Sequence, residues 1–238
     1  MRLGLLLLAC SLSSACAMNS PIENKPIPER GDRSSANQLA KNDFDRMADV
    51  EMAENTQSLR NLMTKLYKRN PNQLAKSTPD PVEKMVDWVF EGEQQHHFQF
   101  KEIDNKQGTD AIFLAFDANY QGDRVLPFIV GLHTMLLKAH GNKTDFYLTD
   151  TIDPQSVYNV ARNIEIAAWK LSPARDANGN LYLLTNEISD KDRNLSFERE
   201  FGKMIGRTDL YAIALAEKSQ RLISRVMQSL TTAVFLPF

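Results

Sequence analysis

Apolar residues recur at helical spacing along most of the chain, which predicts a mainly helical protein. The clearest stripe follows Asp43 and falls at positions i, i+3, i+4, i+7 and i+8. Lys68 and Arg69 lie where the dipole of a helix favours cations, directly before Pro71, which stops the helix. The apolar positions of this predicted helix include Leu59, Leu62, Met63, Leu66 and Tyr67.

Two further predicted helices begin with the dipeptide Asp-Pro, at Asp80-Pro81 and at Asp153-Pro154. In each, a carboxylate able to cap the free N–H groups precedes a proline that suits the first helical position. The first helix should end at Gly92 and bury Val82, Met85, Val86, Val89 and Phe90. The second should bury Val157, Val160, Ala161, Ile164, Ala168 and Leu171.

The central part of the chain is its most apolar part. Residues 123–140 are apolar on most sides, as in the buried central helix of a bundle, and Pro127 fits only the first turn. A short run at 111–116 suits a helix capped by Thr109, or else a buried strand.

Short strands are expected at two places. Phe98 and Phe100 alternate with polar residues, and Asn178-Gly179 is a favoured two-residue turn of a hairpin. Two more helices are expected near 195–206 and 208–233. The pattern therefore predicts one compact, mainly α domain over residues 42–238, with about six or seven helices and a few short strands.

The first residues have the order of a secretory signal. Arg2 precedes the apolar run 3–9, and small residues surround Cys16. That run is far shorter than the roughly 20 residues of a spanning helix. A cysteine after a small residue also matches a bacterial lipobox, so we expect residues 1–16 to be a lipoprotein-type signal peptide and Cys16 to be acylated. The alternatives are Cys10, which would leave a short signal, and unlipidated cleavage after Ala17.

Residues 17–41 are rich in Asn, Ser, Pro and charge, and we expect a disordered tether there. The rest of the chain contains no cysteine, so it has neither a disulfide nor a thiol nucleophile. With 42% hydrophobic residues, the chain can bury a substantial core. Its formal charge of -2 argues against nucleic acid as a partner.

The most distinctive polar pattern is a second stripe on the helix after Asp153. Tyr158, Arg162, Glu165 and Trp169 fall at i, i+4, i+7 and i+11, which places an Arg–Glu pair between two aromatic residues. Arg, Tyr and Trp are the usual hot-spot residues of interfaces, so these four are the candidate contacts for a partner or ligand. The alternative is an interhelical salt bridge framed by packed rings.

Other candidate chemistry is less specific. Asp176, Asn178, Asn180 and Glu187 match four positions of a calcium loop, but Leu181 replaces its glycine, and a plain hairpin explains the same residues. The four histidines lack zinc spacing, and no nucleophile elbow, phosphate loop or dinucleotide fingerprint is present. We therefore expect no catalytic residue, metal or cofactor.

The lipobox-like start, "FDANYQGDRVLPFIVGLHTMLLKAHGNKTDFYLTDTIDPQSVYNVARNIEIAAWKL" and "NLSFEREFGKMIGR" resemble uncharacterised envelope lipoproteins of Gram-negative proteobacteria. The resemblance covers most of the chain after the tether and implies a location only. Neither candidate cysteine is followed by Asp, and for such lipoproteins this implies the periplasmic face of the outer membrane.

From these patterns we expect a lipid-anchored binding or scaffolding module that engages another envelope protein in envelope assembly or maintenance. One alternative is a periplasmic carrier of an apolar ligand, suggested by the apolar helix 125–137 with Phe113 and Phe116 nearby. The other is a hydrolase that uses carboxylates or a histidine-bound metal.

Overall fold

The structure, a computed structural model, describes residues 41–147, 150–188, 193–220, 223 and 234–238. The predicted signal peptide with Cys10 and Cys16, and the tether as far as residue 40, lie outside these residues. The described part is mainly helical, as the apolar spacing predicts.

Helix α2, Asp43–Arg69, has the bounds expected from the sequence. Its first turn is fixed by a capping box. The Asn42 side chain accepts from the N–H groups of Phe44 and Asp45, at 2.8 and 3.0 Å, and the Asp45 carboxylate accepts from the N–H of Asn42. At the other end Asn70 closes the helix, and the short α3, Pro71–Ser77, follows with its proline in the first turn.

The next segment corrects two predictions. Helix α4, Val82–Glu91, ends at Gly92 as expected, but the residue before it is Pro81 rather than Asp80. Phe98 and Phe100 do not form a strand. Phe98 lies in a turn that follows α5, Glu93–His96, and Phe100 directly precedes the 3-10 helix η1, Lys101–Ile103.

Both phenylalanines are buried, and the difference from a strand lies in the backbone that carries them. His97 and Phe98 have φ of 48° and 54°, in the left-handed region, so the backbone turns between them instead of extending. A strand would have kept the backbone extended and placed the polar neighbours of Phe98 and Phe100 on the face opposite the two rings.

Helices α6, Gly108–Phe116, and α7, Val125–Ala139, form the centre of the domain. Every residue of α7 except Lys138 is buried, which confirms the predicted central helix. The two helices approach closely at Gly131, where an added Cβ would lie 2.6 Å from the carbonyl oxygen of Gly108. A glycine is therefore required at this crossing.

The second half of the domain is a long helical pair. Helix α8, Pro154–Leu171, is capped by Asp153, whose carboxylate accepts from the N–H of Ser156 at 3.0 Å, as predicted. A two-residue antiparallel pair, β1, Glu187–Ile188, and β2, Arg193–Asn194, precedes α9, Ser196–Ser219. The break predicted between helices near 195–206 and 208–233 is wrong, because one helix runs through residue 207 without interruption. Residues 221–222 and 224–233 of the second predicted helix lie outside the described residues.

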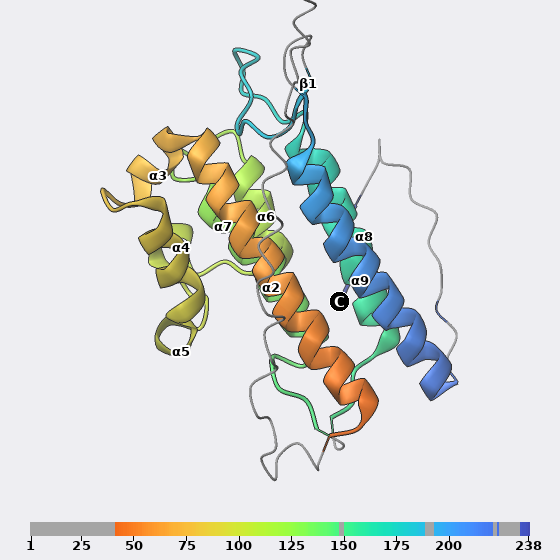
Figure 1. Cartoon of the computed structure of the whole chain (residues 1–238). Coiled ribbons are helices and arrows are strands. Elements are labelled where there is room, and N and C mark those ends of the chain that lie inside the picture. The colour runs from red at the N-terminus through yellow and green to blue at the C-terminus, as the bar shows by residue number, and fades with distance from the viewer. Residues whose placement is uncertain (1–40, 148–149, 189–192, 221–222, 224–233) are drawn as a thin grey trace, which may run out of the picture. The chain divides into compact units, whose positions relative to one another are not determined.

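Helix α2 packs against α4, α7 and α9, while α7 also contacts α6 and α8. Figure 1 shows α2 in front of the central pair α6 and α7, with α8 and α9 to one side and α3 to α5 to the other. The described helices include none that is both long and apolar enough to cross a membrane.

Candidate functional site

Of the four residues in the predicted stripe on α8, three contact one another and the fourth, Trp169, lies apart. The Arg162 guanidinium lies 2.9 Å from the Glu165 carboxylate and also forms an ion pair with Asp209 on α9. Its centre lies 5.3 Å from the centroid of the Tyr158 ring. These three contacts form the interhelical salt bridge and packed ring of the alternative interpretation. Asp209, 47 residues away in sequence, could not be found from the stripe itself.

Trp169 does not join this cluster. Trp169 is 37% exposed near the end of α8, where it borders a cavity of about 520 Å³ between α8 and α9. Glu165 and Glu198 also line this cavity, together with the apolar Ile205. The exposed half of the stripe therefore presents an indole and carboxylates beside a hollow that can receive a side chain from another molecule.

A second site on α8, formed by Asn159 and Asn163, was not predicted from the sequence. Residues 234–238 lie against this helix, and we call them the docked segment. Asn163 pairs with Leu236 through both ends of its amide: Oδ1 accepts from the Leu236 N–H at 2.6 Å, and Nδ2 donates to the Leu236 carbonyl at 2.8 Å. One turn earlier, Asn159 Nδ2 donates to the Pro237 carbonyl at 2.7 Å.

The side chains of the docked segment contact α6 and α7. The Phe235 ring packs edge-on against Phe113, with centroids 5.2 Å apart. The Phe238 ring lies beside Gly108, where a Cβ would be 3.1 Å from Cζ, and the Lys138 ammonium is 4.9 Å from its centroid. Three polar contacts to the backbone of the docked segment thus supplement the packing of its rings.

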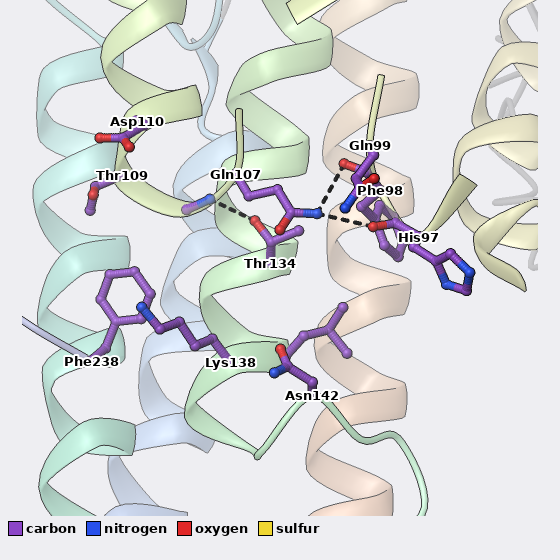
Figure 2. A pocket seen from close by; sticks show the side chains of 12 residues that line it. His97, Phe98, Gln99, Gln107, Thr109, Asp110, Thr134, Lys138, Asn142 and Phe238 are labelled. Atoms are coloured by element: carbon purple, nitrogen blue, oxygen red, sulfur yellow. Dashed lines mark hydrogen bonds between the residues drawn. The ribbon is translucent and has the colours of Figure 1, made fainter. Parts of the chain in front are cut away.

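A cavity of about 600 Å³ begins where Phe238 ends. Figure 2 shows Phe238 and Lys138 at one end and His97 at the other, with Gln107 and Thr134 between them. Gln107 donates to the carbonyls of His97 and Phe98, while Thr134 accepts from the Gly108 N–H at 2.7 Å. These bonds hold the turn at His97 and the start of α6 as fixed walls of the cavity.

A buried polar cluster connects α2, α7 and α9. The Glu51 Oε1 atom accepts from Asn55 Nδ2 at 2.5 Å and from the Thr208 hydroxyl at 2.7 Å. Its Oε2 atom lies 3.1 Å from His140 Nε2, and the other ring nitrogen of His140 contacts the Leu136 carbonyl at 2.8 Å. Tyr211 stacks on the imidazole with ring centroids 5.6 Å apart. No spacing in the sequence brings these residues together.

A second buried carboxylate lies at the start of α7. Asp123 accepts from the hydroxyls of Tyr67 and Ser77, at 2.5 and 2.8 Å, and from the Val125 N–H. Burial raises the pKa of Asp123 and raises that of Tyr67 well above its usual value. The pair joins α2 and α3 to the central helix.

The remaining candidate residues have local roles. Asp176 Oδ1 accepts from the N–H groups of Asn178 and Asn180, and Arg175 pairs with Leu181 across the turn, as a hairpin requires. Glu187 instead lies 2.9 Å from the Arg69 guanidinium. The four residues that resembled a calcium loop are therefore not brought together.

Within the described ranges, no three or more His, Cys, Asp or Glu side chains are grouped so that they could hold a metal ion. His133 is buried against Phe90 and Phe98, and burial lowers its pKa to about 3. Comparison of the chain with protein-family models, with curated proteins and with solved structures found no match in any of the three.

Proposed function

We propose that the chain is an outer-membrane lipoprotein, anchored through Cys16 on the periplasmic side, that acts as a binding or scaffolding module for another envelope protein. The order of basic, apolar and small residues at its start supports export and acylation. Composition at residues 17–41 supports a flexible tether. These sequence features give a location, and the helical domain supplies the contact surface.

The observation that carries the proposed contact is the exposed end of the α8 stripe. Trp169 lies at a cavity that also exposes Glu165, whose side chain is 44% accessible. An indole beside a hollow is the arrangement that interfaces use as an anchor, and the carboxylates favour a basic side chain in the same hollow. The partner expected here presents a cation next to an apolar group.

Photocrosslinking in living cells tests this contact. The full chain would carry p-benzoylphenylalanine in place of Trp169, and a matched variant would carry it in place of Trp88 on α4, which is 46% exposed. A specific adduct with one envelope protein is expected from position 169 and not from position 88. The same abundant proteins captured from both positions would contradict the proposed surface.

The anchor is tested separately by the intact mass of the mature protein extracted from membranes. The expected mass is that of a chain that begins at Cys16 and carries three acyl chains. The mass of a chain that begins after Ala17 without lipid would contradict the anchor. The mass of an acylated chain that begins at Cys10 would assign the lipid to Cys10 instead.

A further inference from the structure

The docked segment is held by hydrogen bonds to its backbone and by the partly buried rings of Phe235 and Phe238. Three hydrogen bonds from Asn159 and Asn163 reach the peptide groups of Leu236 and Pro237. None of its five side chains is buried, and Val234 is 70% exposed. A side-chain amide that offers one donor and one acceptor to the same residue reproduces the edge of a strand, which recognises extended chains of many sequences.

A second asparagine, Asn70, binds a loop backbone in a similar way and can be compared with Asn163. Asn70 pairs with Leu184 in the same bidentate manner, at 2.7 and 2.9 Å. There, however, the neighbouring Leu183 and Thr185 are buried and hold the loop in place. The docked segment has no such buried neighbour among residues 234–238, so its own side chains anchor it less firmly.

The amides on α8 are arranged for an extended backbone. Gln155 donates to Asn159 Oδ1 at 2.8 Å, which directs Asn159 Nδ2 toward the segment. Asn163 is fully buried beneath the segment, although asparagine is a costly residue in the core unless its amide is hydrogen-bonded. A helix that required only core packing at this position would use an apolar side chain.

Proline and the aromatic residues define which segment fits. Pro237 restricts both itself and Leu236 to extended conformations, and it needs no partner for an N–H group. Phe235 and Phe238 lie on either side of this pair, at Phe113 and at Gly108. The cavity beyond Phe238 leaves room for further residues of an occupant.

We propose that the groove formed by α6, α7 and α8 is a peptide-binding site, and that residues 234–238 are its internal competitor. Its external ligand is an extended segment of a partner protein with the pattern aromatic, aliphatic, proline, aromatic. Asn159 and Asn163 bind its backbone, while Phe113 and Gly108 select its aromatic residues. Binding requires that the docked segment leave, so the site is inhibited by the chain itself.

Fluorescence anisotropy with purified full-length chains tests the site. The probe is a fluorescein-labelled peptide that copies residues 232–238. The receptor is the full chain with Phe235→Ala and Phe238→Ala, which weakens the internal competitor and leaves the groove intact. Two matched controls are the same receptor with Asn163→Leu, and a peptide N-methylated at the position of Leu236, which lacks only the N–H that Asn163 accepts.

The double variant should bind the peptide and the wild-type chain should bind it at least about tenfold more weakly, because a tethered segment acts at roughly millimolar effective concentration. Asn163→Leu should weaken binding by about tenfold, the loss expected for two net hydrogen bonds. N-methylation should weaken it in the same direction.

A double variant that keeps its helical circular dichroism and still fails to bind the peptide would overturn the proposal. Equal binding after Asn163→Leu or N-methylation would do the same. Wild-type dimers that disappear with Asn163→Leu would assign the groove to a second copy instead of an external partner. The inference is independent of the lipid anchor and of Trp169, so crosslinking and peptide binding can fail separately.

Discussion

At the scale of single residues, His140 connects the end of α7 to Glu51 on α2. A carbonyl oxygen can only accept, so His140 Nδ1 carries the hydrogen that it donates to Leu136. The Nε2 atom then faces Glu51 Oε2 at 3.1 Å.

Replacement of Glu51 tests how much this pair stabilises the domain. Glu51→Ala leaves Asn55, Thr208 and His140 without their shared partner, and we expect the free energy of unfolding to fall by about 3–5 kcal/mol. Glu51→Gln keeps an oxygen for Asn55 and Thr208 and a polar group that faces His140, so it should cost less than half as much. Urea unfolding measures both, and equal losses would contradict a stabilising contribution from the contacts that Gln retains.

Residue contacts were predictable only within one helix. The i, i+3 spacing of Arg162 and Glu165 predicts their ion pair, which the structure contains. Asn159 and Asn163 lie between predicted core positions, and their spacing alone indicates no partner. Their partner is the backbone of a segment more than 70 residues later, and a backbone group has no signature in the sequence.

At the scale of elements, α9 is continuous where the sequence suggested a break. Gly202 and Gly206 both lie inside this helix, and an added Cβ would meet nothing within 4 Å at either position. Glycine weakens a helix because it loses more backbone entropy than alanine. The glycines therefore lower the local helical preference around residue 206 without ending the helix.

Alanine substitutions distinguish these glycines from Gly131. Gly202→Ala and Gly206→Ala should each raise the free energy of unfolding by roughly 0.5–1 kcal/mol. Gly131→Ala should lower it, because the new Cβ would meet the Gly108 carbonyl oxygen and Ile112 Cγ1 at 2.6 Å. Thermal and urea unfolding of the three variants provide the check, and stabilisation by Gly131→Ala would contradict the close crossing of α6 and α7.

Elements with strong local signals were predicted well. Helices α2, α4, α7 and α8 have apolar stripes together with capping residues or proline starts, and these signals act over a few residues. The turn at Phe98 and Phe100 was missed because burial of both rings depends on α4 and α7, where Trp88 and His133 contact them. Tertiary packing there overrides the alternating pattern.

At the scale of the whole molecule, burial of His133 couples stability to pH. Its folded-state pKa of about 3 lies below the ordinary value of 6.5, so the unfolded chain binds more protons between these values. The neutral imidazole therefore contributes its full stability above pH 6.5 and loses it as the pH falls toward 3. The slope is about 1.4 kcal/mol per pH unit once the pH is well inside this window.

His133→Phe removes this proton-binding group and keeps a ring beside Phe90 and Phe98. Between pH 7 and pH 5, the wild-type free energy of unfolding should fall by about 2 kcal/mol more than that of the variant. Other titrating groups, including Asp123, are common to both proteins and cancel in the difference. Urea unfolding at a series of pH values gives the two curves, and parallel curves would show that His133 is accessible to protons in the folded state.

Because α7 is buried, its amides should exchange with solvent more slowly than those of the docked segment. The amide hydrogens of α7 are surrounded by α2, α6 and α8, so they can exchange with deuterium only when the whole body unfolds. The Leu236 amide is protected by one hydrogen bond to the buried Asn163, and it can exchange when the docked segment alone lifts away. The groove should therefore open and close many times during one lifetime of the folded core.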